Sequence, residues 1–263
     1  MDEQSTRPAA KNYNGNPMCY HKSLTAKYEQ LMEYYSTSYS QTVEELYSIK
    51  FHENGFDFLP GPVVTAGKPS EIQMFNWGLI PFWVKDQTAA TRLKVSTLNC
   101  ISEEMYDKPS YRDAAKEGKR CLIPCTGFFE WRWLDEKGKT KIPYYIHMKD
   151  QPIFSIAGLY SRWVDRTTDQ RYYSYTVLTT QANGMMSTIH NSKQRMPVIL
   201  PRQYEKDWLN PNLTQDDVLA LCQPIDDALM TAHTISKRIT SKTEETNVPE
   251  VLHVQEYQEL NSK

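Results

Sequence analysis

Cys19 is the residue of this sequence with the most distinctive chemistry, because it directly follows a methionine, Met18, at the end of a polar leader. If translation starts at Met18, removal of that methionine leaves Cys19 as the first residue. An amino-terminal cysteine carries an amine and a thiol on adjacent carbons, and together they can trap an aldehyde as a thiazolidine ring. The α-amino group has a pKa of roughly 7.7–8.0, so part of it is neutral and nucleophilic near pH 7. The alternative is that Cys19 is a small buried residue at the start of a strand.

Two titratable side chains, Glu130 and His190, could move protons for such a reaction. Glu130 lies in an aromatic run of a predicted strand, and burial beside rings would raise the pKa of its carboxyl group. Alternation places it on the face opposite Trp131 and Trp133. His190 follows a predicted helix and precedes a strand, so its ring can point into a cleft and titrate near neutral pH. The alternatives are an exposed Glu130 paired with Arg132 and a histidine in a surface loop.

Asn99 ends a predicted strand, where its amide can orient an amine or a sugar oxygen, or can serve a turn. Cys121 and Cys125 are separated by three residues, and neither they nor the histidines form the ligand pairs of a zinc site. The sequence has no glycine-rich phosphate loop. It therefore predicts neither a metal nor an organic cofactor.

The elements that must hold these residues are mostly short strands with a few helices between them. Apolar residues at helical spacing predict a helix over 24–32, capped by Ser23. Residues 95–100 and 128–133 are predicted strands, and residues 183–189 a short helix. This mixture predicts an α+β fold with a curved antiparallel sheet or barrel-like core and several short peripheral helices.

Composition and charge exclude several classes of protein. The net charge of −2 excludes a strongly basic nucleic-acid coat, but it leaves room for a local groove that holds a single strand. The sequence has no apolar run long enough to span a membrane and no apolar secretory region, so we expect no membrane association. Five irregularly spaced cysteines favour free thiols in a reducing cytoplasm.

The chain divides by composition into three parts. We expect residues 1–17 to be a disordered leader, or an extension read from an upstream start codon. Residues 18–240 are expected to form a single domain, and residues 241–263 a C-terminal extension.

A series of short motifs resembles the SRAP family, the SOS response-associated peptidase-like proteins that crosslink to abasic sites in single-stranded DNA. The resemblance extends from Met18 to about Arg238. The motifs are, in order, Met18-Cys19; Trp77-Gly78-Leu79-Ile80-Pro81 with Trp83; Asn99 with Glu103; Lys108-Pro109 with Tyr111-Arg112; Arg120-Cys121-Leu122-Ile123-Pro124; Gly127-Phe128-Phe129-Glu130-Trp131; Ala157-Gly158-Leu159-Tyr160; Thr179-Thr180 with Ala182-Asn183; and Ile189-His190 with Arg195-Met196-Pro197.

The resemblance implies a role for each of four candidate catalytic residues. Cys19 would form the thiazolidine with the ring-opened sugar of an abasic site. Glu130 would move protons during Schiff-base formation and reversal, and His190 would assist opening of the sugar ring. Asn99 would orient the amine and the sugar.

The resemblance also implies a DNA path. Trp77 and Arg195 match positions that line it, where stacking on bases and pairing with phosphates tolerate any sequence. Lys108 is expected to do likewise. The partner is single-stranded DNA containing abasic sites, and the protein is expected to be a cytoplasmic monomer that joins the nucleoid when bound to damaged DNA.

The sequence departs from the family pattern at three points. Tyr20 and His21 follow the cysteine where the family usually has Gly-Arg, and Ile101 stands where an arginine is usual. The leader is the third departure, because it acylates the amine that the chemistry needs. Three hypotheses therefore remain open: abasic-site crosslinking, a thiol autopeptidase that removes its own leader, and noncatalytic binding of single-stranded DNA.

Overall fold

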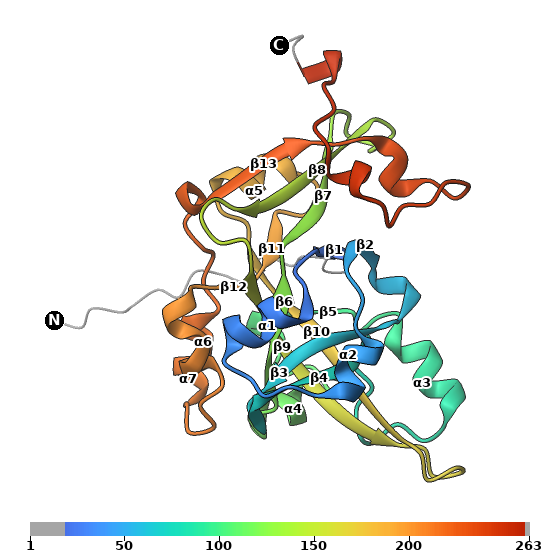
Figure 1. Ribbon diagram of the computed structural model, residues 1–263, viewed down its shortest axis with the longest axis vertical. Helices are drawn as coiled ribbons and strands as arrows, with labels where there is room; N and C mark the ends of the chain where they lie inside the picture. Colours follow the sequence, from blue (N-terminus) through green and yellow to red (C-terminus); the bar gives the residue numbers. More distant parts are fainter. Residues whose placement is uncertain (1–18, 261–263) are drawn as a thin grey trace, which may run out of the picture.

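The protein is built on two β-sheets surrounded by short helices, as the computed structural model in Figure 1 shows. It describes residues 19–260, so the predicted leader over 1–17 lies outside the described residues. The strands are β1 (His21–Leu24), β2 (Lys50–Asn54), β3 (Pro60–Thr65), β4 (Lys68–Trp77), β5 (Asn99–Ile101), β6 (Arg120–Cys125), β7 (Gly127–Trp133), β8 (Lys141–Met148), β9 (Phe154–Val164), β10 (Arg171–Gln181), β11 (Arg195–Pro197), β12 (Ile199–Leu200) and β13 (Met230–Thr234).

Short α-helices and single turns of 3₁₀-helix connect these strands. The α-helices are α1 (Tyr28–Tyr35), α2 (Gln41–Leu46), α3 (Gln87–Lys94), α4 (Arg112–Lys116), α5 (Gly184–Ile189), α6 (Glu205–Trp208) and α7 (Gln215–Leu221). None of the helices within residues 19–260 is long and apolar enough to cross a membrane.

Five strands close into a barrel in the order β10, β4, β3, β6 and β9, because β9 pairs back onto β10. Neighbours in the barrel are antiparallel except β4 and β10, where Trp77 lies opposite Tyr175 in a parallel register. β5 also joins β10 in parallel. Parallel pairing needs a long crossover, which the chain between β4 and β10 supplies. The α+β fold with a barrel-like core is confirmed, and the parallel pairs of β10 with β4 and β5 make the eight-stranded sheet mixed.

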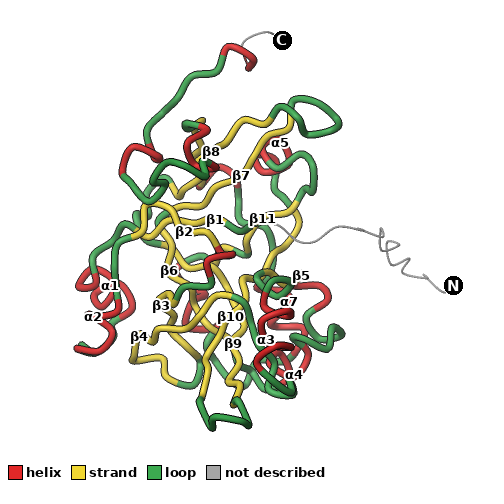
Figure 2. Tube along the Cα trace, turned by 90° about the vertical axis from the view of Figure 1, so that its right-hand side faces the viewer, coloured by secondary structure: helices red, strands yellow, loops and turns green. Residues whose placement is uncertain are grey.

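The second sheet is antiparallel throughout, in the order β13, β8, β7, β1 and β2, and it lies above the barrel in Figures 1 and 2. β6 runs into β7 across Thr126, so one bent stretch of chain belongs to both sheets. The hydroxyl oxygen of Thr126 accepts the backbone N–H of Thr25 at 3.1 Å. A Cβ atom at Gly127 would lie 2.2 Å from the ring of Tyr145, so only glycine permits the close approach at this bend.

The two faces of β7 contribute to different parts of the core. Phe128 packs with the barrel residues, whereas Phe129 packs with Val251 and its neighbours from the C-terminal segment. That segment is anchored to the five-stranded sheet, because the side-chain oxygen of Asn247 accepts the backbone N–H of Phe51 at 2.8 Å. Residues 246–252, within the part expected as an extension, therefore pack against this sheet.

Two local predictions are wrong. Ser23 caps no helix: it lies in β1, with its hydroxyl 3.1 Å from that of Thr126, and α1 begins only at Tyr28. β5 covers only the end of the strand predicted over 95–100, and α3 was not predicted. β1 obtains its hydrogen bonds from β2 and β7, which lie far away in sequence, and this pairing outweighs the helical spacing of its residues.

Candidate active site

A cavity of about 230 Å³ opens beside the five-stranded sheet and brings together two of the predicted catalytic residues. Glu130 reaches it from β7, and His190 reaches it from the end of α5. The other residues that line it are Tyr20, His21, Trp131, Trp133, Lys141, Ser192 and Thr240.

The Glu130 carboxyl group is buried, and no cation pairs with it among the described residues. Its Oε1 atom has no hydrogen-bond partner there, and its Oε2 atom lies 3.7 Å from Nε2 of His190. Burial raises the pKa of Glu130 well above its usual value, because the ionised form loses its hydration. Glu130 is therefore an acid that can keep its proton at neutral pH and donate it.

His190 complements Glu130, because its free ring nitrogen is an acceptor. Its Nδ1 atom lies 2.8 Å from the carbonyl oxygen of Arg195, and since a carbonyl can only accept, Nδ1 carries the hydrogen. Burial lowers the pKa of His190, so the ring is neutral and Nε2 keeps its lone pair. The 3.7 Å between Nε2 and the Glu130 carboxyl is longer than a hydrogen bond and leaves both groups available to a substrate.

The local fold holds His190 in this position from two sides. Asn183 caps the start of α5, because its side chain accepts the backbone N–H of Met186 at 2.9 Å, and His190 directly follows the helix as its C-cap. The loop that follows is joined to β7, because the Asn191 side chain accepts the backbone N–H of Trp133 at 3.0 Å and donates to its carbonyl at 2.9 Å. The Asn191 amide thus satisfies the backbone groups of Trp133 that a neighbouring strand would otherwise bind.

Cys19 lies two residues before β1, which begins at His21. Its side chain is 2% exposed, and burial, followed by the neighbouring Glu130 and Cys125, raises the pKa of the thiol, while Lys22 acts in the opposite direction. Cys19 does not itself line the cavity: Tyr20, the next residue, does. The thiol therefore lies one residue behind the cavity wall.

Asn99 is the first residue of β5 and is buried. Neither atom of its side-chain amide has a partner within residues 19–260, and no hydrogen bond there joins it to Glu130 or His190. An unpaired buried polar group costs about 1–3 kcal/mol. Such a group is suited to receive a ligand, although the structure does not connect Asn99 to the Glu130–His190 pair.

The residues predicted to contact DNA have different environments. Trp77 is 1% exposed, and its indole N–H donates to the carbonyl of Leu98 at 2.8 Å. Its ring is also stacked on Tyr175. Trp77 is therefore a core residue in this structure, and its role in the DNA path stays a prediction.

Arg195 is also bound to other residues of the protein. Its guanidinium donates two hydrogen bonds of 2.8 Å to Glu103 and one of 2.6 Å to the carbonyl of Thr179. Its own carbonyl accepts the Nδ1 hydrogen of His190. The structure therefore gives Arg195 a positioning role, whereas Lys108 is exposed and has only a 3.6 Å ion pair with Glu104.

The cavity also contains aromatic residues to which no role was assigned from the sequence. β1 pairs with β7 only at Lys22–Phe128 and Ser23–Gly127, so from Glu130 onward β7 leaves β1. Trp131 and Trp133 then line the same cavity as Glu130, which strict alternation did not predict. The Lys141 ammonium lies 4.7 Å from the centre of a Trp133 ring. The aromatic run around Glu130 was the feature of the sequence that could have indicated these lining residues.

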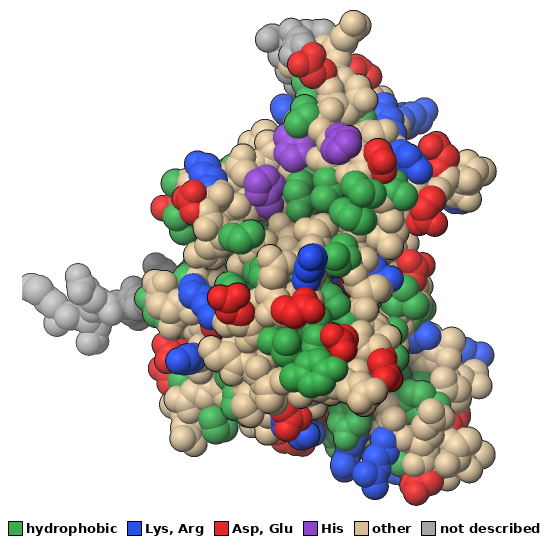
Figure 3. Space-filling model, in the orientation of Figure 1, with side chains coloured by type: hydrophobic (Ala, Val, Ile, Leu, Met, Phe, Trp, Pro, Cys, Tyr) green, Lys and Arg blue, Asp and Glu red, His purple; other side chains and the backbone are tan. Residues whose placement is uncertain are grey.

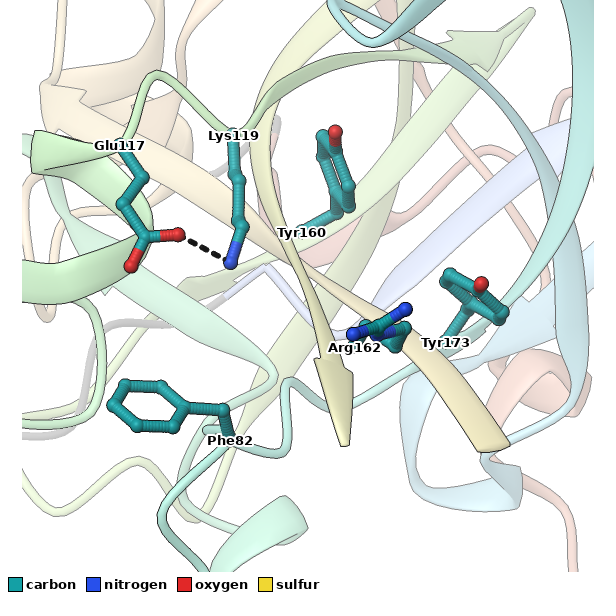
Figure 4. Close-up of a pocket in the computed structure, with 6 residues that line it drawn as sticks. All are labelled: Phe82, Glu117, Lys119, Tyr160, Arg162 and Tyr173. Carbon is teal, nitrogen blue, oxygen red and sulfur yellow. Dashed lines mark ion pairs between the residues drawn. The ribbon is translucent and has the colours of Figure 1, made fainter. Parts of the chain in front are cut away.

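A larger hollow of about 460 Å³ lies elsewhere, over β9 and β10, and Figure 4 shows its side chains arranged around it. A 2.5 Å ion pair between Lys119 and Glu117 forms one side. The remaining residues are Phe82, Tyr160, Arg162 and Tyr173. This hollow contains none of the predicted catalytic residues. Within residues 19–260 no group of three metal-ligating side chains is found at either place.

Comparison with known proteins agrees with this geometry. Residues 18–242 match the family described as SOS response associated peptidase (SRAP). The chain is 38% identical over 191 residues to the abasic site processing protein YoqW of Bacillus subtilis (strain 168), covering 72% of this chain and 80% of the relative. It is 30% identical over 196 residues to the abasic site processing protein HMCES of Xenopus tropicalis, covering 67% of this chain and 55% of the relative.

A crystal structure of a protein from Bacteroides thetaiotaomicron is similar throughout. It superposes with a TM-score of 0.84 at 37% identity, covering 90% of this chain and 100% of that one. The matched range includes the barrel, the five-stranded sheet and the whole Glu130–His190 cavity. The chain therefore belongs to the SOS response associated peptidase (SRAP) family.

Proposed function

We propose that this protein processes abasic sites: it binds single-stranded DNA and forms a covalent thiazolidine crosslink through Cys19, once Cys19 is the first residue of the chain. The observation that carries the proposal is the buried Glu130–His190 pair in a cavity that is also lined by Tyr20, the residue after Cys19. The names of the relatives support the choice of lesion. The crosslink would protect the DNA from strand cleavage at the abasic site.

The chemistry balances without an external reagent. The neutral amine of Cys19 attacks C1′ of the ring-opened sugar and forms a carbinolamine. Glu130 gives its proton to the hydroxyl group, which leaves as water, and an iminium ion remains. The thiol then bonds to C1′ while its proton returns to the Glu130 carboxylate by way of Nε2 of His190. The product is a thiazolidine, and one water molecule is released.

Other residues would position the DNA. The unpaired amide of Asn99 is proposed to orient the sugar or the amine. Trp131 and Trp133 offer half-buried ring surface on which neighbouring bases could stack, and Lys108 an exposed charge for a phosphate. Because Tyr20 separates the thiol from the cavity, the proposal requires that the segment ahead of β1 moves to admit the sugar. The protein would act as a monomer in the cytoplasm, on the nucleoid when DNA is damaged.

The experiment uses a protein that starts at Cys19 and a single-stranded oligonucleotide with one abasic site. We expect a shifted band on a denaturing gel. Cys19→Ser keeps the amine and loses the thiol, so it should give a band only when borohydride traps the imine. A single glycine placed before Cys19 keeps the thiol but moves the amine, and should give none. An undiminished band from the glycine-extended protein would overturn the proposal.

A second activity is release of residues 1–18 by the same site, which the family's description as a peptidase favours. Glu130, whose pKa is raised by burial, is an acid able to protonate a leaving amine. The full chain should lose the mass of residues 1–18 after purification, and Glu130→Ala should retain it. A wild-type protein that retains residues 1–18, or a Glu130→Ala protein that loses them, would contradict self-cleavage.

A further inference from the structure

A pair of hydrogen-bonded histidines lies at the edge of the candidate site and takes no part in the chemistry described above. Nδ1 of His21, from β1, lies 2.8 Å from Nε2 of His52, from β2, and the two rings are stacked. Nδ1 of His52 lies 2.9 Å from the hydroxyl oxygen of Thr246, in the segment that packs against the sheet. In the view of Figure 3, histidine side chains gather beside hydrophobic ones near the top of the molecule, over the part of the five-stranded sheet that Figure 1 labels β13 and β8.

Both rings are neutral at physiological pH. Burial, and then the neighbouring His52, lowers the pKa of His21 to about 3. Burial lowers that of His52 to about 4, although Glu245 acts against it. A neutral imidazole has one N–H donor and one acceptor nitrogen. The hydrogen bond between the rings therefore has a direction, and that direction fixes what the free nitrogen of His21 presents to the cavity.

Two arrangements of the protons are consistent with the distances. In the first, the Thr246 hydroxyl donates to Nδ1 of His52, Nε2–H of His52 donates to Nδ1 of His21, and Nε2–H of His21 points outward. In the second, every hydrogen bond is reversed. The first has both rings in the Nε2–H form, the more stable tautomer of a free histidine side chain, whereas the second has both in the less stable form. The first is therefore favoured.

The free end of this chain of hydrogen bonds reaches the cavity. Nε2 of His21 has no partner among the described residues, and His21 lines the cavity together with Glu130 and His190. The edge of the Trp131 ring system packs against His21, with centroids 4.9 Å apart, and limits rotation of the imidazole. The remaining polar groups on the wall include the hydroxyls of Tyr20, Ser192 and Thr240 and the Lys141 ammonium, a set suited to a phosphate oxygen.

We propose that Thr246 and His52 hold His21 in its Nε2–H form, so that this N–H donates a hydrogen bond to a backbone phosphate oxygen of the DNA in the cavity. His21 is then a DNA-binding residue, and His52 and Thr246 are positioning residues. The proposal rests on the proposed function for the identity of the ligand, but the proton arrangement does not. The segment over residues 241–260 thereby contributes to DNA binding without touching DNA.

The proton arrangement is tested first, on the full chain labelled with ¹⁵N-histidine, by NMR spectra that correlate ring nitrogens with ring protons. We expect Nε2–H for both His21 and His52. Thr246→Val removes the hydroxyl donor and should change the pattern, while Thr246→Ser should restore it. Thr243→Val is the matched control in the same segment, since the Thr243 hydroxyl contacts only that of Ser241, at 3.4 Å. An Nδ1–H form of His21 in the wild type would overturn the proposal.

Binding is tested with an intact single-stranded oligonucleotide, which has no aldehyde and forms no adduct. We expect Thr246→Val to weaken binding about 3- to 10-fold, as for loss of one hydrogen bond, and Thr246→Ser and Thr243→Val to bind like the wild type. With neutral methylphosphonate linkages the difference between wild type and Thr246→Val should disappear. If it persists, the phosphate contact is wrong. Failure of crosslinking alone would leave both of these results standing.

Discussion

At the scale of single residues, the pKa values of two glutamates of this protein are shifted in opposite directions. Burial acts to raise the pKa of Glu103, but the hydrogen bonds and charge of Arg195 outweigh it, and the net pKa is lowered. Glu130 has no such cation, and its pKa is raised by burial alone. The difference lies in the partners, since one carboxyl has two 2.8 Å hydrogen bonds from a guanidinium and the other faces a neutral imidazole.

Glu130→Gln should make the protein more stable at pH 8, by about 1–3 kcal/mol. A group whose pKa is raised in the folded state contributes stability below its unfolded pKa and loses it as pH rises, because the unfolded chain ionises first. The glutamine does not ionise, so its advantage should grow from pH 4 to pH 8. Urea denaturation across this range measures it.

Glu103→Gln serves as the control with the opposite sign. The lowered pKa of Glu103 contributes stability above its unfolded pKa, so this variant should be less stable than the wild type at pH 8. Its deficit should shrink toward pH 4. A Glu130→Gln protein that is less stable than the wild type at pH 8 would show that the carboxyl is ionised in the native state.

At the scale of elements, β10 connects most of the barrel, pairing with β4, β5, β9 and β11. Its closure onto β9 depends on Gly158, where a Cβ atom would lie 2.7 Å from the backbone oxygen of Thr176 and 2.7 Å from Ile123. Backbone cannot yield as a flexible side chain does, so the pairing itself must shift to accept a larger residue.

Gly158→Ala should therefore lower the free energy of unfolding by about 1–3 kcal/mol, through overpacking. Gly67→Ala is the matched control, because the atom nearest to its added Cβ is the phenolic oxygen of Tyr160, the far end of a side chain, at 3.0 Å. Thermal unfolding of both variants compares them. Equal midpoints would mean that the pairing of β9 with β10 accepts a larger residue at position 158 without a loss of stability.

An element can be predicted from the sequence when the interactions that form it join residues that are close together in the chain. α5 was predicted over 183–189, and its cause is local, since Asn183 caps it. Ser23 gives the same kind of signal but lies in β1, because its partners come from segments about a hundred residues away. Glu130 and His190 were identified by their motifs. The ion pair between Arg195 and Glu103 could not be predicted, because it joins two segments that are distant in the sequence.

At the scale of the whole molecule, a net charge of −2 means that binding of DNA depends on a few local cations. Lys141 is one of them, because it lines the cavity and lies over Trp133. An exposed cation that meets a phosphate releases counterions, and this release makes the affinity fall as salt rises.

Lys141→Ala should weaken binding of intact single-stranded DNA and reduce the slope of log affinity against log salt by about 0.7, the value for one phosphate of a single strand. Lys68→Ala is the control, because Lys68 is paired with Glu71 at 2.8 Å and does not line the cavity. Fluorescence anisotropy at several salt concentrations measures both. An unchanged slope for Lys141→Ala would place the phosphates elsewhere.

The position of Cys19 two residues before β1 has a mechanical consequence. β1 is hydrogen-bonded on both sides, to β2 and to β7, and its first residue is only two positions after Cys19. A DNA strand attached there and put under tension would pull along β1. Hydrogen bonds that run across the strand would then be loaded in shear together and not opened one at a time. A polymerase or helicase stalled at the adduct would thus meet a tether that resists extraction, and release of the DNA would depend on reversal of the bond or proteolysis of the barrel.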